Sequence, residues 1–296
     1  MRAVSVLLNV WGGDNPELLD RALISVNQQS LVPDELVVVI DGSISQQLRT
    51  TLIRNIEQLP FRVVTKELPT NIGLWFARNV GLETCRNDLV ALHDADDIMH
   101  PLRLRHQLLA LERMGDSISV LGSPVFEFDT SSFDIISARR TIVNRPLISR
   151  DFTAKNPIHH SSVILSRAAV SRVGMYRNIP GGEDFDLWRR LIRAGAHVIN
   201  DSHFLQALGT DIALLNRRNL SRKIIRGELT MYREQFAVTR GPSRISTTIG
   251  LAARLLYRAT PIPLRSLSQE LFLRVRHVEP PFTLNDFLTC EPTSSQ

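Results

Sequence analysis

Apolar residues in the first hundred positions fall into two alternating patterns. Short runs rich in β-branched and aliphatic residues predict strands over residues 4–10, 35–40, 61–65 and 88–92. Apolar residues at helical spacing predict a helix that opens at Asn15 and further helices over 45–59 and 71–84. Strands that alternate with helices in this order form parallel sheets with right-handed crossovers. The sequence therefore predicts an α/β fold with a mostly parallel, open sheet flanked by helices.

The fourth predicted strand runs into a cluster of acidic residues. The segment 89–97 reads LVALHDADD, so an apolar run is followed at once by Asp94, Asp96 and Asp97. Carboxylates crowded at the carboxyl end of a buried strand repel one another unless a divalent cation and its phosphates lie among them. Ligands of open α/β sheets also bind at that end. The alternative is a polar turn that caps a helix starting near Pro101.

Two further polar segments follow neighbouring strands. Asp41 ends the second strand, where a carboxylate can accept hydrogen bonds from a base or a ribose. Asn71 and Arg78 belong to the helix after the third strand, and the guanidinium fork of Arg78 suits phosphate or base oxygens. Each residue alone also fits a structural role in a turn or a helix. Three such features in order on one parallel sheet favour a nucleotide site.

Composition and length are those of an ordinary globular protein. The 296 residues, 43% hydrophobic and 22% charged, can form one large α/β domain with an appendage. Cys85 and Cys290 are far apart and predict neither a disulfide framework nor metal-ligand spacing, which suits a reducing cytoplasm. The opening MRAVSVLLNVWGG is expected to form a strand rather than a signal peptide. No apolar stretch reaches the roughly 18 residues that a membrane span needs.

The net charge of +5 is concentrated in the C-terminal part of the chain. Residues 217–276 contain thirteen Lys or Arg against three acidic residues. Such a segment predicts an anionic partner, and since no nucleic-acid motif accompanies it, we expect no nucleic acid and favour an anionic membrane surface. Apolar stripes over 244–258 and 264–275 predict helices that either pack on the domain or bind the membrane interface. Residues 280–296 are expected to be a loose tail.

Four segments together resemble the family 2 glycosyltransferases. They are VSVLLNVWGGDNPELLDRALISVNQQSLVPDELVVVIDGS, NIGLWFARNVGL, HDADD and GGEDFDLWRRLIRAG, and the resemblance covers residues 3–225. Members of this family are inverting enzymes with the GT-A nucleotide-sugar fold. The closer likeness is to bacterial enzymes that build capsule, exopolysaccharide and lipopolysaccharide, including those of the amylovoran-biosynthesis type. The resemblance implies a metal-dependent hexosyl- or hexosaminyltransferase that acts on a lipid-linked glycan at the inner face of the cytoplasmic membrane.

The resemblance also assigns donor-binding roles to particular residues. It implies that Asp41 holds the uracil of a UDP-sugar and that Asn71 and Arg78 lie on the donor nucleotide. It implies further that Asp94 contacts the ribose or the metal and that Asp96 binds Mn²⁺ or Mg²⁺ on the diphosphate. The donor is therefore expected to be a nucleotide sugar held together with a divalent cation.

The acceptor side depends on a second acidic pair. Transfer requires a carboxylate to take the proton of the attacking hydroxyl, a role worth typically ~10²–10⁴-fold in rate. Asp184 follows Pro180-Gly181-Gly182 and precedes an amphipathic helix, so it also suits an N-cap. The resemblance favours Asp184 over Glu183 as the base.

Three histidines of the second half have open roles. His159 and His160 lie in a polar loop and suit an acceptor-site or structural role, because their spacing does not indicate a metal site. His203 corresponds by resemblance to a third metal ligand of some relatives. His203 follows a predicted strand over residues 197–200, and the segment QALGTDIALLNRRN after it lacks the Arg that the family pattern has soon after that strand. Arg217 and Arg218 match a paired arginine of the family.

We expect a GT-A domain over residues 1–225 and a helical C-terminal extension over 226–296. Two other functions stay open. A sugar nucleotidyltransferase needs a glycine-rich phosphate loop after the first strand, where Asn9–Asp14 has two glycines and neither GxGxxG nor GxxxxGK[ST] occurs. A catalytically silent nucleotide-sugar-binding protein would not need Asp94, Asp96 and Asp184 together.

Overall fold

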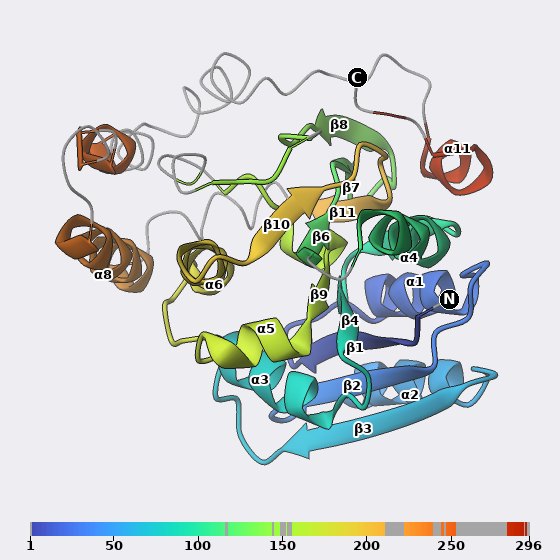
Figure 1. The fold of residues 1–296 in the computed structure, drawn as a ribbon. Coiled ribbons are helices and arrows are strands. Elements are labelled where there is room, and N and C mark those ends of the chain that lie inside the picture. The colour runs from blue at the N-terminus through green and yellow to red at the C-terminus, as the bar shows by residue number, and fades with distance from the viewer. Residues whose placement is uncertain are drawn as a thin grey trace.

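An open sheet with helices on both faces forms the centre of the computed structural model (Figure 1). The structure describes residues 2–115, 118–143, 145–148, 152, 156–210, 222–238, 244–245, 247–252, 283–292 and 294. In the described part, the main sheet has the order β10-β6-β9-β4-β1-β2-β3. Its strands are β1 (Val4–Trp11), β2 (Glu35–Asp41), β3 (Arg62–Leu68), β4 (Leu89–Asp94), β6 (Ile118–Gly122), β9 (Ile164–Ser166) and β10 (His197–Asn200).

Parallel pairing dominates this sheet, as the sequence predicts. β1 pairs in parallel with β2 and β4, β2 with β3, and β10 with β6. β9 is the exception, since it runs antiparallel between β4 and β6. The predicted mostly parallel open sheet is confirmed.

A second, smaller sheet with the order β5-β11-β7-β8 lies beside the acidic segment. It consists of β5 (Ile98–Met99), β7 (Val125–Asp129), β8 (Ile135–Arg139) and β11 (Gln206–Thr210). The apolar run over residues 118–128 forms two strands, β6 and β7, which belong to different sheets. Ser123 and Pro124 separate the two strands, and proline cannot donate a backbone hydrogen bond to a ladder.

Helices cover both faces of the main sheet through two apolar layers. One layer joins α1 (Pro16–Asn27), α2 (Gln46–Ile56) and α4 (Arg103–Met114) to one face. The other joins α3 (Leu74–Thr84), α5 (Arg167–Arg172) and α6 (Glu183–Arg193) to the opposite face. Successive residues of β1 alternate between the layers, with Val6 and Leu8 in the first and Leu7 in the second. Asn15 caps α1 by accepting a hydrogen bond from the Glu17 amide, so the predicted helix start is confirmed.

The C-terminal part returns to the domain at two places. α8 (Arg222–Val238) buries Met231 and Tyr232, and Met231 belongs to the layer that contains α6. α11 (Leu284–Thr289) buries Phe287, which meets the rings of Phe126 and His100. The expectation of a loose tail is therefore wrong for the described residues 283–292, because their aromatic and aliphatic side chains complete an apolar cluster.

Most of the two apolar stripes predicted over 244–258 and 264–275 lies outside the described residues. Within residues 244–252, Ile245 and Ile249 are each 64% exposed. No helix in the described part of the chain is long and apolar enough to cross a bilayer.

Candidate active site

The parallel register brings three polar strand ends side by side. Trp11, at the end of β1, pairs with Asp41 at the end of β2, and Asn9 pairs with Asp94 at the end of β4. Because β1 lies between β2 and β4, residues from distant parts of the sequence line one edge of the sheet. This is the edge at which ligands of open α/β sheets bind.

Asp41 fixes the loop that leads into α3. Its Oδ1 accepts the Ile72 amide at 2.9 Å and its Oδ2 accepts the Gly73 amide at 3.0 Å. The Asn71 side chain donates to the Asp41 carbonyl at 3.3 Å, so Asn71 also holds this loop. Each carboxylate oxygen retains a further lone-pair direction for a ligand. The Asp41 carboxylate thus has a structural role that is compatible with the predicted donor role.

A buried arginine and a buried histidine flank Asp94. The Arg78 Nη2 lies 3.6 Å from Asp94 Oδ1, and the His160 Nδ1 lies 3.9 Å from Asp94 Oδ2, which is too long for a hydrogen bond. Burial opposes ionisation of Asp94, but His160 and Arg78 outweigh it and hold the pKa of Asp94 below its usual range. Burial, together with Arg78, lowers the pKa of His160. Arg78 is therefore the cation that balances Asp94 at neutral pH.

Asp97 is buried and stabilises the acidic turn through hydrogen bonds. The Asp97 amide donates to the Asp94 carbonyl at 3.2 Å, while Asp97 Oδ1 accepts the Gly209 amide at 3.0 Å and Oδ2 accepts the Ser161 hydroxyl. A Cβ at Gly209 would lie 2.2 Å from the Asp96 carbonyl oxygen, so only glycine lets β11 approach the turn this closely. Burial and the nearby Asp96 raise the pKa of Asp97. Asp97 is thus structural, whereas Asp96 is exposed.

A cation buried under the turn adds to this support. Arg103 is fully buried and donates to the Leu92 and Val163 carbonyls at 3.1 and 3.2 Å. It also donates to Gln206 Oε1 at 2.6 Å and to Gln107 Oε1 at 3.1 Å. Burial lowers the pKa of Arg103 to about 9, and the charges of Asp97 and Asp94 oppose this shift. Because a buried charge is costly without compensation, Arg103 and the acidic turn stabilise each other.

Trp11, the last residue of β1, and Asp14, in the loop after it, join the site, although the sequence pattern predicted no site role for either. Burial raises the pKa of Asp14 to about 7, with further contributions from Asp96 and Asp94. The Asp14 carboxylate accepts the Trp11 amide at 2.9 Å, and the Trp11 side chain is 47% exposed beside Asp41. The signal was present in the sequence, because an aromatic residue and a carboxylate follow a predicted strand directly.

The residues at the acidic turn fit a divalent cation that is shared with a substrate. Hard cations prefer oxygen ligands, which Asp94 and Asp96 supply, and the repulsion felt at Asp14 reflects an excess of negative charge. Among the described residues no group of three or more His, Cys, Asp or Glu side chains is arranged to hold a metal by itself. Magnesium is commonly bound by one or two carboxylates together with substrate phosphates, so this donor set suits such a shared site.

Asp184 and Glu183 lie in the first turn of α6. The N-cap is Gly182, so the alternative role of Asp184 as N-cap is wrong. Asp184 Oδ2 accepts from the Asn156 side chain at 2.8 Å, and Oδ1 accepts the Phe185 amide at 2.7 Å. The charge of Asp184 opposes the lowering of the His160 pKa. Burial raises the pKa of Glu183, and the charge of Arg78 opposes that shift. The structure therefore brings the 183–184 pair to the same cluster as Arg78 and His160.

His160 and His203 have different surroundings. His160 contacts the Tyr176 hydroxyl at 2.9 Å through Nε2, which places it between Asp94 and the segment that leads to α6. The His203 Nδ1 lies 2.7 Å from Asp201 Oδ1, and its ring lies 5.1 Å from that of His106. In the described chain His203 does not join Asp94 and Asp96 in a metal-binding group, and its role as third ligand stays a prediction. Arg217 and Arg218 lie outside the described residues.

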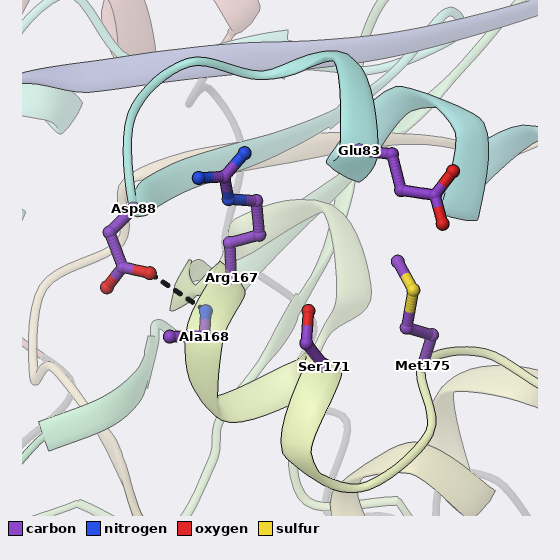
Figure 2. A pocket seen from close by; sticks show the side chains of 6 residues that line it. All are labelled: Glu83, Asp88, Arg167, Ala168, Ser171 and Met175. Atoms are coloured by element: carbon purple, nitrogen blue, oxygen red, sulfur yellow. Dashed lines mark hydrogen bonds between the residues drawn. The ribbon is translucent and has the colours of Figure 1, made fainter.

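A cavity of about 350 Å³ lies at the other end of β4 and is separate from this site (Figure 2). It is lined by Glu83, Asp88, Arg167, Ala168, Ser171 and Met175. Asp88 precedes β4 and accepts the Ala168 amide at 2.8 Å, whereas Asp94 ends the strand. The length of β4 therefore separates this cavity from the acidic turn.

Comparison with known proteins agrees with this geometry. The family model described as glycosyl transferase family 2 matches residues 8–174. The chain is 30% identical over 262 residues to the amylovoran biosynthesis glycosyltransferase AmsE of Erwinia amylovora, covering 87% of this chain and 94% of that protein. It is 31% identical over 195 residues to the UDP-Gal:alpha-D-GlcNAc-diphosphoundecaprenol beta-1,3-galactosyltransferase of Escherichia coli, covering 65% of this chain and 69% of that protein.

Solved structures share the fold at low sequence identity. The mannosyltransferase PcManGT of Pyrobaculum calidifontis, in complex with GDP-Man and Mn²⁺, has a TM-score of 0.61 at 15% identity, covering 91% of this chain and 79% of that one. TarS 1–349 of S. aureus in complex with UDP-GlcNAc has a TM-score of 0.61 at 16% identity, covering 90% and 74%. At these identities the likeness concerns the fold.

Proposed function

Because the chain belongs to glycosyl transferase family 2, we propose that it is an inverting transferase that moves a hexosyl or hexosaminyl group from a UDP-sugar to a lipid-linked glycan in bacterial surface polysaccharide synthesis. The observation that carries this proposal is the cluster of Asp94, Arg78 and His160. Asp184 belongs to the same surroundings, because its charge affects the pKa of His160. This arrangement combines a site for a charged donor with a carboxylate for the acceptor. The names of the two bacterial relatives support transfer of a sugar to a glycan, and the second names both a UDP-sugar and a lipid-linked acceptor.

The donor nucleotide would occupy the edge formed by β1 and β2. Asp41 would accept a hydrogen bond from the base, and the exposed Trp11 ring beside it would stack on the base. Arg78 lies beside Asp94 with its guanidinium fork, which suits the diphosphate. Asn71 would act by fixing the loop around Asp41.

Asp96 and Asp94 would hold a divalent cation, Mn²⁺ or Mg²⁺, on the diphosphate. When bound, such an ion neutralises the negative charge that develops on the leaving nucleoside diphosphate. Asp97 and Arg103 would keep the turn in position, because both are buried and hydrogen-bonded behind it. The proposal therefore assigns the three aspartates of the turn to two roles, since Asp97 supports while Asp94 and Asp96 bind.

In the transfer step the acceptor hydroxyl attacks the anomeric carbon from the face opposite the diphosphate. The new carbon–oxygen bond forms as the bond to the phosphate oxygen breaks, and the configuration inverts. The hydroxyl proton passes to the carboxylate of Asp184, which is held by Asn156 and the Phe185 amide. Glu183 is the alternative base, and its raised pKa, caused by burial, suits proton uptake.

One relative and the C-terminal part of the chain support the proposed acceptor and cellular site. The relative that acts on a diphosphoundecaprenol-linked sugar supports a lipid-linked acceptor. The basic residues of 217–276 and the exposed Ile245 and Ile249 support peripheral binding to the inner face of the cytoplasmic membrane. We therefore propose a domain boundary between the catalytic fold and a basic extension near residues 225–226, with α8 docked on the catalytic fold.

The test is release of the nucleoside diphosphate from a panel of UDP-, GDP- and TDP-sugars with a diphosphate-lipid glycan acceptor. Wild-type protein should release UDP only with acceptor and divalent cation, and EDTA or Asp96→Ala should reduce the rate to background. Donor binding without turnover under every condition would favour the catalytically silent binding protein. Full activity in EDTA or in Asp96→Ala would contradict the metal assignment.

A further inference from the structure

A four-residue ion network joins α6, the segment before it, and α8. Asp186, in the first turn of α6, is 3% exposed and accepts hydrogen bonds from Arg177 Nε at 3.0 Å and from Arg190 Nε at 2.8 Å. Arg177 Nη2 also donates to Asp186 Oδ1. The same Nη2 reaches Glu234 Oε2 on α8 at 2.7 Å, with Nη1 at 3.3 Å from Oε1. Two arginines and two carboxylates thus balance each other at the start of α6.

Close packing brings α8 against the same segment. A Cβ on Gly182 would lie 2.5 Å from Met231 Cε, and one on Gly227 would lie 2.8 Å from the Pro180 carbonyl oxygen. The Arg189 guanidinium lies 5.6 Å from the Tyr232 ring centroid. α8 therefore covers the residues that lead directly into Glu183 and Asp184, as the neighbouring ribbons of α6 and α8 in Figure 1 illustrate.

The residue before Arg177 is tied to the donor side. The Tyr176 amide donates to the Asn79 side chain at 2.9 Å, and the Asn79 side chain donates back to the Tyr176 carbonyl at 2.9 Å. Asn79 follows Arg78 on α3, and the Tyr176 hydroxyl contacts His160. Residues 176 and 177 therefore connect α3, which carries Arg78, with the start of α6.

We propose that Arg177, Asp186 and Glu234 form an ionic latch by which α8 holds the first turn of α6, and with it the catalytic carboxylate, at a fixed position relative to the donor. The inference rests on the proposed function, because it assigns the base to Asp184 or Glu183. The three residues are positioning residues, since their charged groups bond to one another. Misplacement of a reacting group by about 1 Å can cost on the order of 10²-fold in rate, so a latch at this place controls turnover.

The chain offers a matched control for the Arg177–Glu234 pair of the latch. Arg49 and Glu67 form a second two-contact pair, at 2.8 and 3.0 Å, which joins α2 to the edge strand β3. The arginine side chains of both pairs are 36% exposed, and the Glu67 and Glu234 side chains are 53% and 42% exposed. Glu234→Gln and Glu67→Gln therefore remove the same charge from similar pairs, of which only the Arg177–Glu234 pair is linked to Asp186 of α6.

The experiment compares the steady-state kinetics of wild-type protein, Glu234→Gln, Glu67→Gln and Asp186→Asn. We expect Glu234→Gln to lower kcat by roughly 10-fold and Asp186→Asn by roughly 100-fold while the KM for the donor stays within about twofold, because the reacting groups are displaced rather than removed. Glu67→Gln should match the wild type, and Glu234→Asp should recover part of kcat because it restores the charge. A kcat of Glu234→Gln equal to that of Glu67→Gln would overturn the latch.

Amide hydrogen exchange provides a readout that needs no substrate. In the full-length protein Glu234→Gln should accelerate exchange in residues 182–188 by roughly 10-fold relative to Glu67→Gln, because the first turn of α6 opens more often. Equal exchange in the two variants would overturn the latch even if Asp186→Asn fails to fold. Absence of glycosyl transfer by the wild type would contradict the proposed function, and the exchange comparison would still decide the latch.

Discussion

At the scale of single residues, the environment of each carboxylate differs more than its place in the sequence suggests. Asp94, Asp96 and Asp97 lie within four positions, yet Asp94 faces Arg78, Asp96 is exposed and Asp97 is buried against Ser161 and Gly209. Glu183 and Asp184 are neighbours, and only Asp184 is held by Asn156. Residue type and spacing therefore indicate a candidate site, whereas the contacts of each carboxylate distinguish its role within that site.

The first residue-scale prediction separates the two candidate bases. Asp184→Asn keeps the shape of the side chain but cannot accept a proton near neutral pH, so donor binding should persist while kcat falls by about 10²–10⁴-fold. Titration calorimetry with the donor and a UDP-release assay measure the two quantities. Glu183→Gln is the matched variant and should retain most activity. An inactive Glu183→Gln beside an active Asp184→Asn would move the assignment by one residue.

The sequence predicts the site unevenly for physical reasons. Asp41 and Asp94 end strands and Arg78 lies in the helix after the third strand, so local pattern and sheet topology place them together. Arg103 and Asp186 were not predicted, because their importance depends on burial and on partners far along the chain, such as Gln206 and Glu234. Asp14 has a local signal in the sequence, because it is a carboxylate that closely follows the end of β1.

At the scale of elements, long periodic segments were predicted best. The strands of the first ninety residues and helices α1 to α3 agree with the pattern to within a few residues. The sequence pattern does not reveal the break between β6 and β7, because both flanking runs are apolar and periodicity alone does not show which sheet a strand joins. The docking of α11 was missed because its six residues are too short for a periodic signal, and aromatic contacts determine its position.

The element-scale prediction concerns α11. Phe287 is 2% exposed against Phe126 and His100, and truncation of a buried phenylalanine typically costs about 3–5 kcal/mol. Phe287→Ala should therefore undock α11 and accelerate amide exchange over residues 284–290, while the main sheet stays protected. Leu288→Ala, at a partly buried neighbouring position, is the control and should have a smaller effect. Unchanged exchange in Phe287→Ala would mean that the backbone contacts, such as the His100 bond to the Cys290 carbonyl, suffice.

At the scale of the whole molecule, basic and acidic residues are concentrated in different parts of the chain. Residues 240–276 contain seven arginines and one acidic residue, and the described part of this segment exposes Ile245 and Ile249. The edge of the sheet that carries the candidate site is acidic at the turn formed by residues 94–97. This division suits an enzyme that binds an anionic surface with one region and a cation with another.

The whole-molecule prediction is salt-sensitive binding to anionic vesicles. Each arginine near an anionic leaflet contributes about 1 kcal/mol, so sedimentation should occur with anionic but not with neutral vesicles and should weaken as salt increases. The double variant Ile245→Ser, Ile249→Ser should bind less, whereas Ile53→Ser on α2, where the side chain is 44% exposed, should bind as the wild type does. Equal and negligible sedimentation with both vesicle types would assign the segment to packing within the protein.

The hydrogen bonds that hold Asp97 have a consequence for folding during synthesis on the ribosome. Asp97 accepts hydrogen bonds from Ser161 and from Gly209, which lie 64 and 112 positions later in the chain. At about 5–20 residues per second, synthesis of those 112 residues takes roughly 6–20 s. During that interval the nascent first half can form its strands and helices, but the acidic turn lacks its supports. A half-made chain would therefore carry the residues proposed to bind the donor without an assembled site, and the site would form only late in synthesis, when β11 joins the smaller sheet.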